Sequence, residues 1–210
     1  MPRLSVREQL IDAAYDHIHE HGFAGSGVKD ITDAAGVPKG SFYNHFDSKE
    51  AMAVEVMRRY SADQGTEILA DRSKAPLERI REHFAYVTGR LEHFAYARGC
   101  MIGNLGAELS AQNSAILEAV DRSLTCWVTR LAAALDEARA AGTLANPVDG
   151  LALAQFLVNA WEGAAMRAKI SKSRTPLDDF SAVFESLAAV AVAPPSPTGP
   201  ARPTTRETVR

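Results

Sequence analysis

The chain contains 210 residues, of which 46% are hydrophobic and 23% are charged. These proportions are those of an ordinary globular protein, and they exclude a wholly disordered chain or a membrane protein. The formal net charge of −3 at pH 7 excludes a generally basic nucleic-acid-binding protein, because phosphate neutralisation supplies most non-specific affinity for DNA.

The sequence carries no targeting or metal-binding pattern. No apolar run approaches the ~20 residues that a membrane-spanning helix needs, and the first residues lack a hydrophobic signal core. We therefore expect a cytoplasmic protein that does not contact a membrane. The two cysteines, Cys100 and Cys126, lack metal-ligand spacing, and a disulfide between them is not expected in a reducing cytosol. The scattered histidines form no metal set, so we expect no metal and no cofactor.

Apolar residues recur at helical spacing from Ser5 onward, which predicts an all-α fold. Ser5 and Glu8 form a capping-box pattern that predicts the start of a helix. The predicted N-terminal elements are a first helix ending at Gly22, a second over residues 28–35, a third from Pro38 to His45, and a longer fourth capped by Asp47 or Ser48.

The rest of the chain predicts a helical bundle, because apolar residues alternate spacings of three and four. Its predicted helices are one from Pro76 to Phe94, one that begins after Gly99, one over residues 116–135 that stops near Gly142, one opened by Asn146 and Pro147, and a last one opened by Pro176. We expect a head over residues 1–48, a body over 49–192 and a flexible tail over 193–210, where proline-rich sequence offers little to bury.

The two short helices and the turn between them have the dimensions of a helix-turn-helix. Gly36 provides the backbone freedom that the turn requires, and Val37 and Phe42 can fix the angle between the helices. Such a unit places its second helix in the major groove of DNA. A local basic surface on an otherwise acidic chain is therefore expected near Ser26–Phe46.

Residues 36–50, GVPKGSFYNHFDSKE, resemble the signature of TetR-family repressors. Together the head and the helical body are similar to that family over most of the chain. The resemblance implies a homodimeric transcriptional repressor that binds double-stranded operator DNA and releases it on sensing a small effector. It also implies a regulator rather than an enzyme.

Eight polar residues of the head are candidate DNA contacts. Those suited to phosphate are Ser26, Lys29, Tyr43, His45 and Lys49. Those better placed to reach base edges are Lys39, Ser41 and Asn44, although Lys39 suits phosphate equally. Each residue taken singly also fits an ordinary solvated face, whereas Phe42 and Phe46 are expected in the core.

Dimerisation is expected through the last two long helices, which pair across a two-fold axis into a four-helix bundle in similar repressors. The pairing would bury Phe156, Leu157, Phe180 and Phe184. A core within one chain is the alternative for each of these side chains.

A second resemblance points to the effector. Residues 98–110, RGCMIGNLGAELS, and 167–177, RAKISKSRTPL, are similar to those of the N-ethylmaleimide-responsive, electrophile-sensing subgroup. It implies that Cys100 is a sensing thiol with Lys169 near it. A thiol after Gly99 at a helix N-terminus would have its thiolate favoured by the helix dipole and a cation. The alternative is a buried, unreactive cysteine, which is the interpretation that we favour for Cys126.

Two other functions compete with thiol sensing. One is a repressor that reversibly binds a small unsaturated acid or its thioester, in a pocket that Trp161, Phe84 and Tyr86 can line; aromatic residues at helical spacing also fit simple packing. The other is a small helical enzyme with Cys100 as nucleophile. The sequence displays no base and orienting group around that thiol, which disfavours catalysis.

Overall fold

A computed structural model describes residues 5–109, 113–144 and 147–189, so the expected tail over 193–210 lies outside the described residues. Within those ranges all regular structure is helical, which confirms the all-α class. The helices are α1 Val6–His21, α2 Val28–Ala34, α3 Lys39–Phe42, α4 Lys49–Ala62, the 3₁₀ helix η1 Thr66–Ala70, α5 Pro76–His93, α6 Met101–Glu108, α7 Ser114–Ala140, α8 Gly150–Ser171 and α9 Thr175–Ala188. No helix in the described part of the chain is long and apolar enough to cross a membrane.

The capping residues act as their chemistry predicts. The Ser5 hydroxyl accepts from the Glu8 N–H, and the Glu8 carboxylate accepts from the Ser5 N–H, which completes the predicted capping box. Helix α1 ends at Gly22, whose φ of 76° is unfavourable for other residues. Ser48 caps α4 by accepting from the Ala51 N–H at 3.1 Å.

Two predicted boundaries were wrong by a turn or less. Helix α3 ends at Phe42, and residues 43–45 form turns rather than the second helical turn predicted to reach His45. Helix α8 begins at Gly150 with Asp149 as its side-chain cap, rather than at Pro147. A side chain that accepts the free N–H groups of the first turn decides this boundary.

The head, α1 to α3, closes around its own apolar residues. Ile31 and Phe42 have no solvent exposure, and they join the two short helices to α1. Gly36 has φ of 67°, and the turn is closed by the Val37 N–H donating to the Thr32 carbonyl at 3.0 Å. The turn therefore requires the glycine that the sequence supplies.

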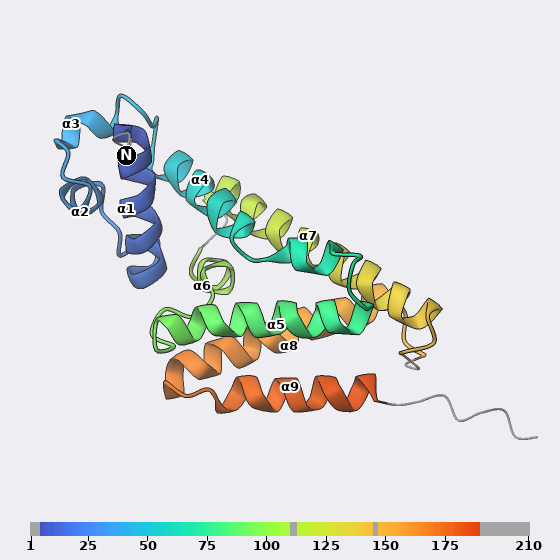
Figure 1. Cartoon of the computed structure of the whole chain (residues 1–210). Helices are drawn as coiled ribbons and strands as arrows, with labels where there is room; N and C mark the ends of the chain where they lie inside the picture. The colour runs from blue at the N-terminus through green and yellow to red at the C-terminus, as the bar shows by residue number, and fades with distance from the viewer. Residues whose placement is uncertain (1–4, 110–112, 145–146, 190–210) are drawn as a thin grey trace, which may run out of the picture.

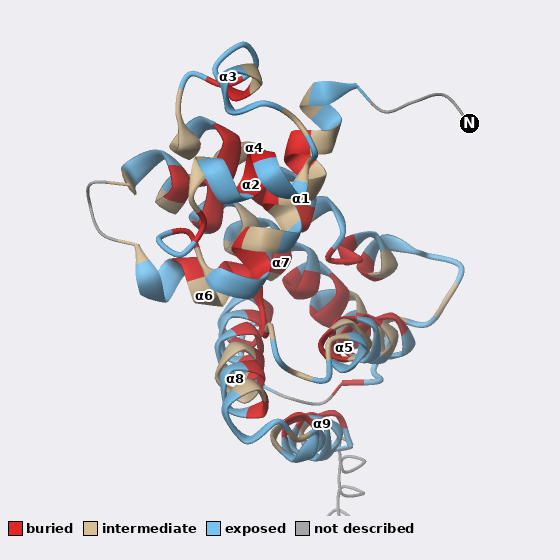
Figure 2. Cartoon of the chain, turned by 90° about the vertical axis from the view of Figure 1, so that its left-hand side faces the viewer, coloured by how far each residue is buried: buried red, intermediate tan, exposed pale blue. Residues whose placement is uncertain are grey.

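Helix α7 is the central helix of the body and packs against α4, α5 and α8, while α9 lies along α8 (Figure 1). Trp127, Leu131 and Leu135 of α7 are buried between these helices. Cys126 was expected in the core but is exposed, because a helix turns by about 100° per residue and Trp127 takes the inward position. Figure 2 shows this division, with buried residues on the faces that helices turn toward one another.

Short helix α6 lies where the head meets the body (Figure 1). It follows the turn after α5, and it packs against α4 and α7. Because α6 lies between the head and the body, the residues of both parts that face α6 lie close to one another.

Candidate functional site

The first candidate site is the outer face of the helix-turn-helix. Lys39, Asn44 and His45 are exposed, as is Tyr43, with 61% of its surface accessible, and Ser41 is half-buried. Phe42 between them is fully buried and holds this segment to the head. The arrangement presents hydrogen-bond donors and a cation on one outer surface.

Three other predicted contacts have partners within the protein. Ser26 is fully buried, and its hydroxyl donates to the Gly22 carbonyl at 2.6 Å, which corrects its expected role as a phosphate contact. Lys49 donates to the Phe23 carbonyl at 2.9 Å and lies over the Phe23 ring. Exposed Lys29 pairs with Asp33, its neighbour one turn along α2.

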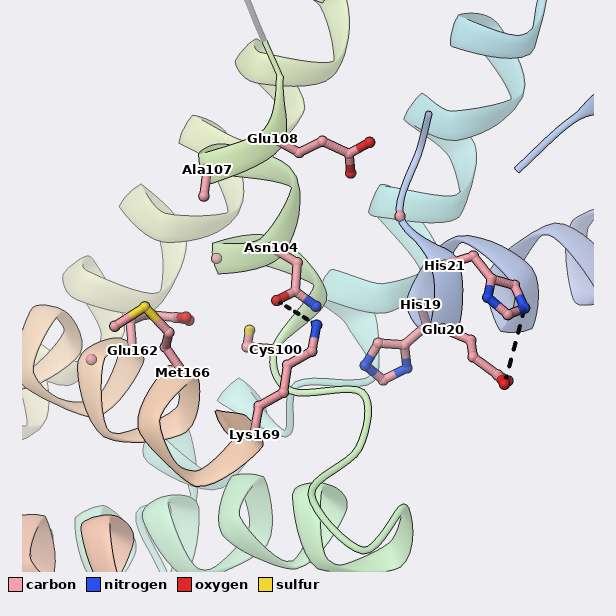
Figure 3. Close-up of a pocket in the computed structure, with 13 residues that line it drawn as sticks. His19, Glu20, His21, Cys100, Asn104, Ala107, Glu108, Glu162, Met166 and Lys169 are labelled. Carbon is pink, nitrogen blue, oxygen red and sulfur yellow. Dashed lines mark hydrogen bonds and ion pairs between the residues drawn. The ribbon is translucent and has the colours of Figure 1, made fainter. Parts of the chain in front are cut away.

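The second candidate site is a cavity of about 590 Å³ between the head and the body. Its wall comes from the end of α1, from α6 and from α8 (Figure 3). The lining residues are His19, Glu20, His21, Gly22, Cys100, Gly103, Asn104, Ala107, Glu108, Glu162, Gly163, Met166 and Lys169. Cys100 and Lys169, which lie far apart in the sequence, therefore share one cavity.

Trp161 is not part of this wall. It is fully buried, with its ring centroid 5.3 Å from that of Trp127 in the core of the body. Both indole N–H groups, and one ring nitrogen of His83, are buried without a partner. Of the three predicted sensing residues, Cys100 and Lys169 thus line the cavity, whereas Trp161 belongs to a packed aromatic cluster.

Cys100 caps the N-terminus of α6, as predicted, but only 4% of its surface is exposed. The Tyr60 hydroxyl donates to Sγ at 3.7 Å and accepts from the Met101 N–H at 3.1 Å. Burial, followed by the charge of Glu162, raises the pKa of the Cys100 thiol well above its usual range. The expectation of a favoured thiolate was therefore wrong, because loss of solvent outweighs the helix dipole.

The sequence analysis missed Glu162. Its carboxyl lines the same cavity as the Cys100 thiol, and burial raises the pKa of Glu162 to about 7. The Lys169 amine lies 3.4 Å from Asn104 Oδ1 on the other side of the cavity. Glu162 and Lys169 are seven residues apart, two turns along one face of α8, and that spacing was the available signal.

Both ends of α6 hold the head. At its C-terminal end the Glu108 carboxylate accepts from the Phe23 N–H at 2.9 Å and from the Ala24 N–H at 2.6 Å. Before its N-terminal end, the His19 ring donates to the Gly99 carbonyl at 2.9 Å. A further pair of bonds joins Arg98 to two α1 carboxylates, those of Asp16 and Glu20.

Comparison with known proteins identifies the family. The model for bacterial regulatory proteins of the tetR family matches residues 10–56, and that for the tetracyclin repressor-like C-terminal domain matches 76–184. The chain is 38% identical over 191 residues to the HTH-type transcriptional repressor DhaR of Mycobacterium sp. (strain GP1), covering 89% of this chain and 94% of DhaR.

Two solved structures are also similar. One is the regulatory protein TetR from Rhodobacter sphaeroides, with a TM-score of 0.79 and 34% identity over 86% of this chain and 97% of that one. The other is E. coli NemR in its reduced form, with a TM-score of 0.77 and 32% identity over 90% of this chain and all of that one.

The buried ring of His19 predicts a pH dependence of stability. Burial lowers the pKa of His19 from 6.5 to about 4, and its Nδ1 has no partner for a second proton. As the pH falls, the His19 ring therefore takes up a proton in the unfolded chain before it does so in the folded chain. The free energy of unfolding that His19 contributes above pH ~6.5 is therefore lost progressively toward pH 4. His83, whose pKa burial also lowers to about 4, acts in the same direction.

Between pH 7.5 and pH 5, His19 should account for ~2 kcal/mol of the decrease in the free energy of unfolding of the wild type. We expect this part of the decrease to be absent in His19→Gln. Urea unfolding at the two pH values measures this difference, with His93→Gln, an exposed position, as the control. An unchanged pH dependence in His19→Gln would contradict the assignment.

Proposed function

The chain belongs to the TetR family of bacterial regulatory proteins and is a transcriptional repressor. On that premise we propose that it binds operator DNA as a homodimer and releases it when an electrophile or an oxidant modifies Cys100. One observation carries the proposal: the cavity that holds Cys100 and Lys169 is walled by the head as well as by the body. Because bacterial operators lie in the cytoplasm, the repressor acts there.

Operator contact is assigned to the exposed segment around α3. Lys39, Ser41 and Asn44 are the candidates for base edges, and Tyr43 and His45 are candidates for phosphate. Lys29 remains a candidate, because solvent screens an exposed pair such as Lys29–Asp33 and the lysine can exchange its partner for a phosphate.

Dimerisation is assigned to the outer face of α8 and α9. Phe156 and Val183 are each 55% exposed, and they line one apolar groove together with Phe180 and Phe184, which are already buried within the chain. Leu157 is buried within the chain, so it supports this face from below. Pairing two such faces across a two-fold axis would place two heads on one operator.

Release follows from the position of α6. Adding a group to Cys100 enlarges the side chain at the start of α6 and would fill part of the cavity between the end of α1, α6 and α8, so that the group presses against α6 and the head. Helix α6 ends at Glu108, which holds the loop after α1 by two hydrogen bonds. Displacement of α6 would therefore reorient the head and remove it from the spacing that the operator requires.

Two chemistries can modify the thiol. An activated alkene alkylates sulfur directly. A two-electron oxidant gives a sulfenic acid, and its condensation with the Lys169 amine would form an S–N bond with loss of water. The chain is similar to E. coli NemR, and the crystal structure of NemR is described as that of its reduced form. That description refers to the redox state of NemR and supports the oxidant as a candidate signal.

Reversible binding of a small unsaturated acid or its thioester is the second candidate. The cavity also supports this function, because the Lys169 amine and the Asn104 amide can pair with a carboxylate or a carbonyl without reaction at Cys100. The unpartnered indole N–H of Trp161 would be the donor if the acid entered the aromatic cluster instead. A thiol enzyme has less support, since the relatives that match are named as regulators.

Replacing Lys39 and Tyr43 together by alanine should weaken operator binding at least about tenfold and reduce the salt slope by about one. Fluorescence anisotropy on the DNA upstream of the protein's own gene, at two salt concentrations, measures both effects. Arg72→Ala, which removes a charge from an exposed loop of the body, is the control. Unchanged sequence-specific binding by the double variant would rule out this contact surface.

Replacing Phe156 and Val183 together by glutamate should convert a dimer into a monomer, because four like charges would be buried in the paired faces. Light scattering after size-exclusion chromatography measures the mass. Thr125→Glu, an exposed position on α7, is the control. A double variant that stays dimeric would place the interface elsewhere.

Cys100→Ser should bind operator DNA normally but remain bound when N-ethylmaleimide or hypochlorite is added, whereas the wild type should lose at least about tenfold in affinity, or ~1.4 kcal/mol. A mobility-shift assay measures release. Cys126→Ser removes the exposed cysteine and should respond as the wild type does. Release of Cys100→Ser by these reagents, with short unsaturated acids tested in parallel, would favour the second candidate.

A further inference from the structure

We propose that Glu162 is the group that takes the proton of the Cys100 thiol when Cys100 adds to an activated alkene. This inference rests on the proposed thiol sensing and adds a second functional residue to it. A buried thiol beside a carboxylate is a poor nucleophile until its proton leaves. The chain therefore needs an acceptor within the cavity.

The geometry of α6 and α8 brings the two groups together. Glu162 lies on α8 facing Gly103 of α6, where a Cβ would collide with Glu162 Oε2. The absence of a side chain at residue 103 leaves room for the Glu162 carboxyl, and Glu162 and Cys100 line the same cavity, where burial, followed by the charge of Glu162, raises the pKa of the thiol. Glu162 Oε1 is buried without a hydrogen-bond partner, so the carboxyl has an oxygen that can accept a proton without breaking an existing bond.

The other polar groups around the thiol are poorer proton acceptors. Tyr60 of α4 donates to Sγ and accepts from a backbone N–H. His19 of α1 donates to a carbonyl through Nε2, and burial lowers its pKa to about 4, so its unpartnered Nδ1 is a weaker base than the Glu162 carboxylate. Glu108, at the far end of α6, accepts from two N–H groups of the head. Lys169 of α8 is a cation, which can stabilise negative charge on the reacting molecule but cannot accept the proton.

The reaction balances without another reagent. As sulfur bonds to the β-carbon of an α,β-unsaturated carbonyl compound, the S–H proton passes to the Glu162 carboxylate and the π electrons move onto the carbonyl oxygen as an enolate. The enolate carbon then takes a proton from the Glu162 carboxyl, which regenerates the carboxylate. The net change is addition of S–H across the double bond, with no leaving group and no redox step.

The test is the rate at which N-ethylmaleimide alkylates Cys100 in the full chain, followed by mass spectrometry over pH 5.5–9. The pKa of Glu162 is about 7, so the carboxyl can accept a proton only above that pH. The wild-type rate should rise through pH 7 and then level off. Glu162→Gln should lower the rate at pH 8 about 10²-fold and remove the inflection near pH 7.

Gly103→Ala provides a second variant that keeps every charge. Its methyl group displaces the Glu162 carboxyl, so its rate should also fall. Cys126 is exposed and serves as an internal reference in every sample, because its alkylation should be the same in all three proteins. A change of packing alone would not move the pH at which the rate inflects.

Two failures are distinguishable. If wild-type Cys100 is not alkylated while Cys126 is, the proposed thiol sensing is wrong and Glu162 has no reaction to assist. If wild-type Cys100 is alkylated and Glu162→Gln reacts at the same rate with the same pH profile, thiol sensing stands and the role of Glu162 is wrong.

Discussion

The orientation of the head depends on the Glu108 carboxylate, which accepts two backbone N–H groups from the loop after α1. Lys49 holds the same loop from α4 by donating to the Phe23 carbonyl. A carboxylate makes stronger hydrogen bonds to backbone N–H groups than a neutral acceptor does, and solvent around the exposed Glu108 side chain reduces part of this advantage. Because the head has only a small core of its own, these few bonds determine its orientation relative to the body.

Local chemistry explains what could be predicted from the sequence. The caps at Ser5, Gly22 and Ser48 involve groups within four residues of one another, so their bonds do not depend on the rest of the fold. Side-chain direction is different. Ser26 is turned inward by a loop whose path depends on Glu108, and Cys126 is turned outward because Trp127 fills the core.

The cavity was even harder to predict from the sequence than the direction of single side chains. Glu162 and Lys169 could be placed on one face of a helix from their spacing, but nothing in the sequence says that α6 lies against that face. The thiol was misjudged for a related reason. A helix N-terminus stabilises a charge by ~0.3–1 kcal/mol, whereas full burial can shift a pKa by 3–5 units, or ~4–7 kcal/mol. The larger effect decides the protonation of Cys100.

A cavity with one wall on the DNA-binding head and the other on the body couples two binding equilibria. If a ligand in that cavity lowers the affinity of the repressor for DNA, thermodynamic reciprocity requires that bound DNA lower the affinity of the repressor for the ligand by the same factor. Operator-bound repressor would then sense less readily than free repressor. The number of operator copies in the cell would therefore help to set the effector concentration at which transcription begins.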